Sequence, residues 1–172
     1  FGIFTGSASG GAAVLLEAFS SADAFLDFCA ENFDAAELRT VKADTPPRVV
    51  LNAVKRLKSR GLYVTIHGAL DENFFAPYEE LLAENLQESY TVTVHPLATH
   101  EKTVEALSEI CKKIEENAYQ VTIALENQRL KETKHYGTCA DVARVAQEIN
   151  SKALRLCFDF GHQLNNEKTG AE

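Results

Sequence analysis

The sequence predicts an α/β fold, a parallel (β/α)8 barrel that is incomplete in this chain, with about six strands and five helices. First, short β-rich segments alternate with helical segments, which is typical of βαβ units and a parallel sheet. Second, the predicted strands carry apolar residues on one face and small or polar residues on the other. Third, ionisable residues stand where several strands end, which is where barrel enzymes place their chemistry.

The first half of the chain is expected to form three strands with helices between them. A helix with apolar residues at helical spacing begins near Ser21, after a Gly/Ser/Ala-rich loop. Thr45 and Pro46 resemble a helix N-cap followed by proline at the first helical position, and this helix stops near Gly61. The predicted strands of this half are residues 1–6, 35–41 and 62–67.

The second half is expected to add three strands and to end in a loop. Thr138 and Asp141 resemble a capping box, with Asp in place of the usual Glu or Gln, at the start of its last helix. Two earlier helices are expected before and after the fourth strand. The predicted strands are residues 90–95, 121–126 and 154–160, the two earlier helices are 78–86 and 101–117, and the polar tail 163–172 is a loop.

Alternate residues along a strand face opposite sides of a sheet, so the character of each face can be read from the sequence. One face is apolar, as at Val64 and Ile66, and should pack against the helices. The other is small or polar, as at Thr65, which suits the inner face of a barrel better than an open sheet covered on both sides. Arg155 falls on this inner face, and Glu37 is its hypothetical partner because an unpaired buried charge is costly.

The chain is expected to be a single domain over residues 1–172, because this length can bury one sizeable core. A complete barrel has eight βα units and about 250 residues. We therefore expect a partial barrel that lacks the last two βα units, either as a fragment of a longer polypeptide or as a chain completed by another.

Composition excludes several classes of protein. The net charge of −8 disfavours non-specific nucleic-acid binding, which requires basic surface. No stretch approaches the roughly 18 consecutive apolar residues of a membrane span. The four cysteines are widely spaced without a CxxC pair, which argues against a zinc ribbon or a disulfide framework. We therefore expect reduced thiols and a cytoplasmic protein without membrane contact.

Imidazole and carboxylate groups stand at or next to the ends of four predicted strands. This set of donors suits Zn, Mn, Fe or Co. A lone His at a strand end is usually a hydrogen-bonded rim residue, but a carboxylate at the end of an apolar strand is costly without a cation. Their coincidence favours a shared metal or catalytic site. The candidates are His67, His95, Glu126, Asp159 and His162.

The loop after the fifth strand carries a second set of candidates. Lys131, Lys134 and His135 could bind an anionic substrate above the strand ends, and a solvated loop is the alternative interpretation. The cysteines have no evident nucleophilic role.

Five motifs occur in order along nearly the whole chain. They are AAELR from residue 35, VTIHG from 64, VTVHP from 92, ALEN from 124 and CFDFGH from 157. Together they resemble the xylose-isomerase-like TIM barrel superfamily, truncated here after the sixth strand. That superfamily includes sugar phosphate isomerases and epimerases as well as endonuclease IV-type AP endonucleases (AP endonuclease family 2).

The isomerase and epimerase branch is the favoured resemblance. It implies that Glu126 and Asp159 bind one divalent metal, Mn, Co or Mg, with two further ligands from strands seven and eight. Glu126 would act as acid or base and His162 would contact the substrate, so these are the expected catalytic residues. The chemistry implied is proton transfer next to a carbonyl on a carbohydrate. The predicted substrate-binding residues are His67, His95, His162, Lys134 and His135.

Two alternatives stay open. In the endonuclease-like branch, residues matching the five strand-end candidates bind a trinuclear zinc cluster that hydrolyses a phosphodiester in abasic DNA. The acidic charge and the Gly-Ala-Leu that follows His67 count against that branch, so a nucleic-acid partner is not expected. The other alternative is a catalytically inactive barrel fragment, since half of the metal shell is missing. A small carbohydrate is the expected partner, and a homo-oligomer is compatible with the sequence.

Overall fold

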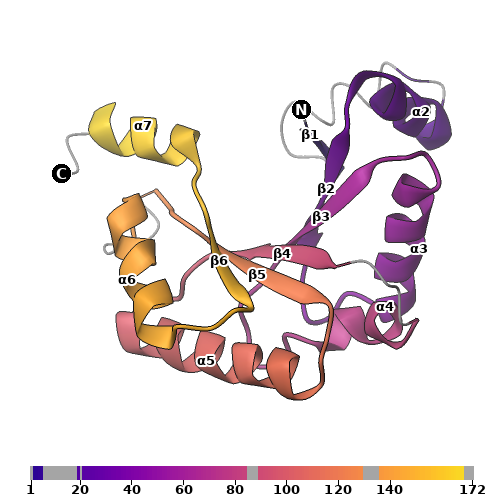
Figure 1. The fold of residues 1–172 in the computed structure, drawn as a ribbon. Coiled ribbons are helices and arrows are strands. Elements are labelled where there is room, and N and C mark those ends of the chain that lie inside the picture. Colours follow the sequence, from indigo (N-terminus) through magenta and orange to yellow (C-terminus); the bar gives the residue numbers. More distant parts are fainter. Residues whose placement is uncertain (1, 6–18, 20, 85–88, 130–135, 169–172) are drawn as a thin grey trace. The chain divides into compact units, whose positions relative to one another are not determined.

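The computed structural model describes residues 2–5, 19, 21–84, 89–129 and 136–168 (Figure 1). Contacts between residues divide the chain into two compact units. Each unit contains parallel strands that alternate with helices, which confirms the predicted α/β class. Among the described residues, no helix combines the length and the apolar character that crossing a membrane requires. The first unit comprises residues 1–68 and 75–86, and the second comprises residues 69–74 and 87–172.

The first unit is built on three parallel strands that pair in sequence order. Helix α3 packs against β2 and β3 and against the short helical turns that end the unit. Its apolar stripe, which includes Val50 and Val54, is fully buried against these neighbours. The elements are β1 (Gly2–Thr5), α2 (Ala22–Asn32), β2 (Ala35–Val41), α3 (Pro47–Lys58), β3 (Tyr63–Gly68), the 3-10 helix η1 (Ala76–Tyr78) and α4 (Glu79–Ala83).

The second unit repeats this arrangement with three more parallel strands, again paired in sequence order. Helices α5 and α6 pack against each other, and α6 also packs against β6 (Figure 1). Glu126 at the end of β5 pairs with Cys157 at the end of β6, so the carboxyl ends of these two strands are in register. The elements are β4 (Tyr90–Val94), α5 (His100–Glu116), β5 (Val121–Glu126), α6 (Cys139–Ile149), β6 (Leu154–Cys157) and α7 (Phe160–Lys168).

Side-chain caps fix several helix starts where the sequence predicts them. The Ser21 hydroxyl accepts a hydrogen bond from a backbone N–H in the first turn of α2. Thr138 and Asp141 form the complete capping box at the start of α6, which satisfies N–H groups that a helix leaves unpaired. The prediction at α3 is wrong by one residue. Its N-cap is Pro46, and the Thr45 hydroxyl accepts from the Lys42 N–H in the preceding turn.

The apolar face of the strands forms most of the core, as the alternation predicts. Val92, Ile123 and Leu154 align across the three strands of the second unit and are all buried. The pattern weakens in β6, where Leu156 is 40% exposed. Within the described residues β6 is the last strand of the sheet, so one of its edges has no neighbouring strand.

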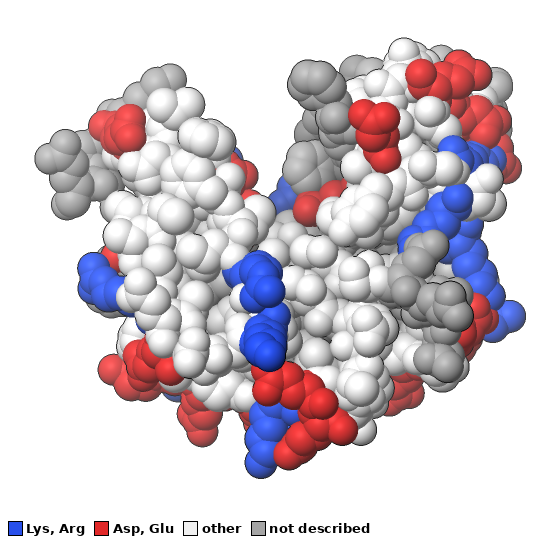
Figure 2. Space-filling view, in the orientation of Figure 1, with Lys and Arg blue, Asp and Glu red and all other residues white. Residues whose placement is uncertain are grey.

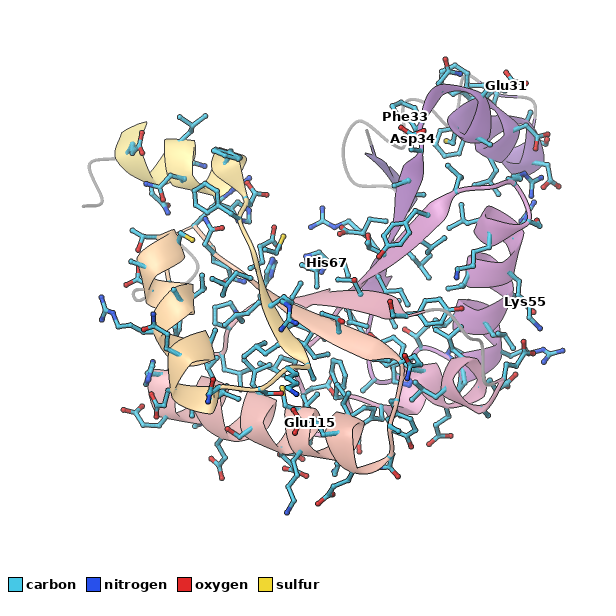
Figure 3. All side chains as sticks on the ribbon, viewed as in Figure 1. Glu31, Phe33, Asp34, Lys55, His67 and Glu115 are labelled. Atoms are coloured by element: carbon cyan, nitrogen blue, oxygen red, sulfur yellow. The ribbon has the colours of Figure 1, made fainter. Side chains whose placement is uncertain are left out.

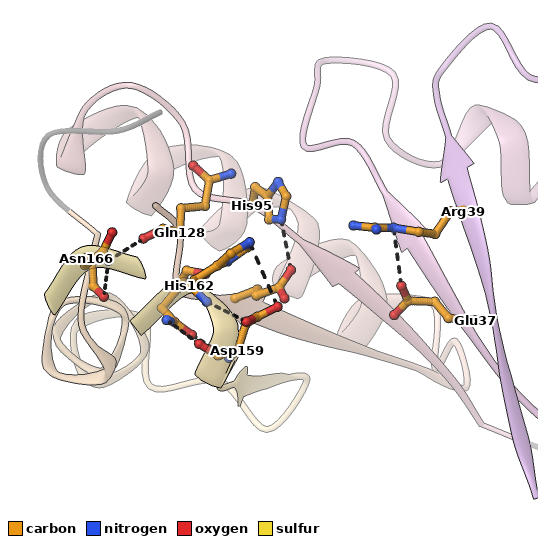
Figure 4. Close-up of polar contacts among 10 residues, drawn as sticks. Glu37, Arg39, His95, Gln128, Asp159, His162 and Asn166 are labelled. Carbon is orange, nitrogen blue, oxygen red and sulfur yellow. Dashed lines mark hydrogen bonds and ion pairs between the residues drawn. The ribbon is translucent and has the colours of Figure 1, made fainter. Parts of the chain in front are cut away.

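The prediction that Arg155 is a buried cation is wrong. Its side chain is exposed, and the guanidinium donates to the carbonyl oxygen of Leu154 at 2.8 Å. Glu37 lies 3.6 Å from the guanidinium of Arg39 on the same strand (Figure 4). Residues two apart share a face of a strand, so this pair forms within β2.

The predicted loop after residue 162 is also wrong, because α7 occupies residues 160–168. Asp159 begins this helix as its N-cap, since its carboxylate accepts from the His162 N–H three residues later at 2.7 Å. The apolar residues of α7 do not form a buried stripe: Phe160 is 71% exposed and Leu164 is 53% exposed. The hydrophobic periodicity used to predict the other helices is therefore missing here.

Candidate metal centre

Three of the predicted residues come together within the second unit. Glu126 is the last residue of β5, Asp159 follows β6, and His162 lies in the first turn of α7. Each offers one ligand atom, and these atoms all lie within 4.8 Å of one another. Glu126 is only 7% exposed, while Asp159 and His162 are partly exposed. The site therefore combines one buried carboxylate, that of Glu126, with two side chains that solvent can reach.

Asp159 uses its two carboxylate oxygens differently. Oδ1 accepts the His162 N–H as the helix cap. Oδ2 lies 3.9 Å from His162 Nε2 (Figure 4). The cap orients the carboxylate group, so that Oδ2 is directed toward the imidazole ring.

The space beside Asp159 is narrow at Gly161. Gly161 lies within α7, and a Cβ at this position would stand 3.0 Å from Asp159 Oδ1. That separation is shorter than an ordinary van der Waals contact, so any larger residue would displace the carboxylate. The glycine of the Asp-x-x-His motif thus leaves room for the carboxylate that caps the helix.

The His162 ring is held by the backbone. Its Nδ1 lies 2.8 Å from the carbonyl oxygen of Asn127. A carbonyl oxygen can only accept a hydrogen bond, so Nδ1 carries the proton in this contact. In the neutral ring, Nε2 then keeps its lone pair and faces the carboxylates. A histidine that binds a metal commonly donates its other N–H to a carbonyl in this way.

His95 contacts Glu126 directly. It follows the last residue of β4, and its Nε2 lies 2.9 Å from Glu126 Oε2. The ring centroids of His95 and His162 are 6.2 Å apart. An ionised carboxylate only accepts hydrogen bonds, so His95 donates Nε2–H to Glu126. This contact orients one oxygen of the buried carboxylate.

The chemistry of this group suits a divalent cation. Two carboxylates and one imidazole nitrogen are hard and borderline ligands that accept Mn, Co, Mg or Zn. Two carboxylates this close repel each other when both are ionised, and one of them is buried. A cation between them would offset both costs, so the residues present fit a metal ion.

Comparison with known proteins identifies the family. The family described as xylose isomerase-like TIM barrel matches residues 26–171. The chain belongs to this family. No curated protein sequence matches the chain.

Solved structures of two epimerases share the fold of this chain. A D-psicose 3-epimerase crystallised in the presence of D-fructose superposes with a TM-score of 0.61 at 14% identity, covering 96% of this chain and 65% of that one. A D-allulose 3-epimerase from Methylomonas sp. in complex with D-allulose gives a TM-score of 0.59 at 16% identity, covering 94% of this chain and 63% of that one. The chain thus spans a little under two thirds of each neighbour, and the predicted incomplete barrel is confirmed.

The remaining predicted site residues have different outcomes. His67 is buried near the carboxyl end of β3, in the first unit (Figure 3). Its role as a metal or substrate ligand stays a prediction. Lys131, Lys134 and His135 fall in the segment 130–135, which lies outside the described residues.

Three buried amide residues around the site were not predicted from the sequence. Asn127 is fully buried, and Gln128 and Asn166 are nearly so. Asn127 bonds to the backbone of Asp159, and Asn166 bonds to the backbone of Gln128 (Figure 4). A run of three polar residues directly after a buried strand, Glu126 to Gln128, is the signal that could have indicated them. Both polar atoms of the Asn127 amide are hydrogen-bonded, whereas the buried Oε1 of Gln128 has no hydrogen-bond partner among the described residues.

The expectation that the cysteines have no nucleophilic role stays a prediction. All four are free within the described residues. Burial raises the pKa of the Cys29 and Cys111 thiols, which lowers the fraction present as reactive thiolate.

Proposed function

We propose that this protein is a metal-dependent isomerase or epimerase that transfers a proton next to a carbonyl on a sugar or sugar phosphate. The observation that carries the proposal is the convergence of Glu126, Asp159 and His162, with ligand atoms within 4.8 Å, after strands of a xylose isomerase-like barrel. Strand ends of barrels are where catalytic groups gather. The epimerases of similar fold bind ketohexoses, which makes a ketose the first substrate class to test.

Each residue has a proposed role. The carboxylates of Glu126 and Asp159 and the Nε2 atom of His162 would hold a divalent ion such as Mn²⁺, Co²⁺ or Mg²⁺. Such an ion, when bound, would polarise carbonyl and hydroxyl oxygens of the sugar. Glu126 is also the proposed acid or base, and the N–H of His95 holds its Oε2 in a fixed direction. The proposed substrate contacts remain His67, His95, His162, Lys134 and His135.

Metal binding can be tested by titration calorimetry with Mn²⁺, Co²⁺, Mg²⁺ and Zn²⁺. Glu126→Gln and Asp159→Asn keep the shape of each side chain but remove its charge, and should weaken binding at least about tenfold. Glu105→Gln is the matched control, because Glu105 is an exposed residue on α5. Wild-type affinity in both Glu126→Gln and Asp159→Asn would contradict the proposed site.

Proton transfer can be tested directly. The metal-loaded protein is incubated with D-fructose or D-allulose in deuterated water, and deuterium incorporation next to the carbonyl is followed by NMR. Wild-type protein should exchange the proton, while Glu126→Gln should not, because its amide cannot accept a proton. Exchange that persists in Glu126→Gln would remove Glu126 from the proposed acid or base role.

The endonuclease-like alternative receives less support. A zinc phosphodiesterase would need basic side chains that reach a DNA backbone. On α3, the guanidinium groups of Arg56 and Arg48 pair with Asp23 at 2.6 Å and Glu80 at 3.0 Å. In Figure 2, the Lys and Arg side chains over α3 lie beside acidic ones. Binding of about three zinc ions per chain rather than one would favour this alternative.

The inactive-fragment alternative predicts that no metal binds and that stability does not change when metal is added. The same titrations therefore separate it from the enzyme. A cytoplasmic location and a homo-oligomeric state stay predictions, which cell fractionation and sedimentation of the protein would test.

A further inference from the structure

We propose that Asn127 is a positioning residue that sets both Asp159 and His162 in the proposed metal site. This inference rests on the proposed function, because it assigns Asn127 a role toward the same metal. Asn127 directly follows Glu126 in the chain, and hydrogen bonds join it to the other two candidate ligands, Asp159 and His162.

The side chain of Asn127 continues the sheet beyond the end of β6. Its Nδ2 donates to the carbonyl oxygen of Asp159 at 3.1 Å, and its Oδ1 accepts from the Asp159 N–H at 2.7 Å. Both backbone groups of Asp159 are therefore satisfied by one amide. This pairing imitates the two hydrogen bonds that a neighbouring strand would supply. It fixes Asp159 although β6 ends at Cys157.

The backbone of Asn127 fixes the second ligand. Its carbonyl oxygen accepts Nδ1–H of His162 at 2.8 Å. This contact leaves the Nε2 lone pair of the neutral ring facing Asp159 Oδ2, 3.9 Å away. Because Asp159 also caps the helix that carries His162, displacing Asp159 would displace the ring as well.

Burial makes this arrangement rigid. Asn127 is fully buried, so water cannot replace its amide without a rearrangement. The structure thus assigns to one residue the position of the Asp159 carboxylate and the tautomer of His162. Mutation of a residue that orients metal ligands typically weakens metal affinity about 10–100-fold.

The test uses Asn127→Ala, Asn127→Asp and a control that only lowers stability. Asn127→Asp keeps the acceptor for the Asp159 N–H but places a second oxygen against the Asp159 carbonyl. Leu107→Ala is the control, since Leu107 is fully buried in α5 and its apolar side chain takes no part in the hydrogen bonds that join Asn127 to Asp159 and His162. Mn²⁺ affinity is measured by calorimetry at a temperature at which circular dichroism shows all variants folded.

We expect Asn127→Ala and Asn127→Asp to lose about tenfold or more in Mn²⁺ affinity, while Leu107→Ala keeps wild-type affinity within about twofold. Wild-type affinity in Asn127→Ala, or an equal loss in Leu107→Ala, would overturn the proposal. In the second case the loss would reflect general stability rather than positioning.

A second readout does not depend on metal. The ring nitrogens of His162 are observed by ¹⁵N NMR in metal-free protein at about pH 8, where an ordinary histidine is neutral, with His162→Gln used for assignment. We expect the Nδ1–H tautomer in the wild type. Asn127→Ala keeps the backbone carbonyl that accepts this N–H, but it releases Asp159 and the first turn of α7 that Asp159 caps, so a mixture of tautomers is expected. Identical tautomers in both proteins would overturn the positioning role. If wild-type protein binds no metal, the proposed function fails, and this readout still decides the role of Asn127.

Discussion

Removal of the Asn166 side chain should destabilise the second unit by an amount that the structure allows us to estimate. Asn166 lies on α7 and is buried, with 5% of its surface exposed. Its Nδ2 donates to the carbonyl oxygens of Gln128 at 3.1 Å and Gly137 at 3.0 Å. These two carbonyls flank the segment between β5 and α6. Each hydrogen bond contributes about 1 kcal/mol net, and an unsatisfied buried acceptor adds to the loss. We expect Asn166→Ala to lower the free energy of unfolding by about 2–3 kcal/mol.

Asn166→Asp sharpens this prediction. It preserves the size of the side chain but replaces the donating amide with an oxygen that faces two carbonyl oxygens. The repulsion should make Asn166→Asp less stable than Asn166→Ala at neutral pH, although the alanine variant removes more atoms. A simple loss of packing predicts the reverse order.

The assay is urea unfolding followed by circular dichroism, together with hydrogen exchange of the backbone amides in α7. Asn52→Ala serves as the control, because Asn52 is an exposed residue within α3 and alanine favours a helix. A loss below about 0.5 kcal/mol in Asn166→Ala would refute the reasoning. Such a small loss would mean that α7 already separates from the rest of the unit at urea concentrations below the main unfolding transition.

Three further predictions concern other parts of the chain. Gly161→Ala should weaken Mn²⁺ binding in calorimetry by crowding Asp159 Oδ1, while the melting temperature should change little, because alanine favours a helix by up to about 1 kcal/mol and the disturbed Asp159 cap costs a similar amount. Leu107→Ala should lower the free energy of unfolding in urea by about 2–5 kcal/mol, since this side chain is fully buried. A change below about 1 kcal/mol would mean that neighbouring side chains move to fill the cavity. A hydrogen bond from Arg56 lowers the pKa of Asp23 from 3.8, so the stability it contributes is present above pH 3.8 and is lost as the pH falls through the lower folded value. Asp23→Asn should therefore lower the melting temperature slightly at pH 7, and this effect should shrink as the pH falls below 3.8.

The strands and the main site residues can be predicted from the sequence for one physical reason. A strand that packs on one face must alternate its residues, and the alternation marks where the strand lies, although β6 ends at Cys157 rather than at the predicted residue 160. Predicted and observed bounds agree at Ala35–Val41 and Val121–Glu126. Glu126 and Asp159 stand out because a carboxylate next to an apolar strand requires a compensating partner.

The rest depends on contacts between distant segments, which one sequence does not reveal. Helix α7 lacks an apolar stripe, so only the capping preference of Asp159 could have indicated it. The role of Asn127 depends on a residue 32 positions away, at the end of another strand. Arg155 follows the inner-face alternation but is exposed in β6, where side chains at the sheet edge can reach water.

The order of strands in the second unit also bears on how the protein is made. Strands β4, β5 and β6 pair in the order in which a ribosome would release them. Each pairing closes a loop of roughly thirty residues, for which the entropic cost grows only slowly with length. A nascent chain can therefore add one strand at a time without undoing earlier pairs. Glu126 would remain at the open edge of the sheet until His162 is synthesised, so the three candidate ligands come together only after β6 and α7 have formed.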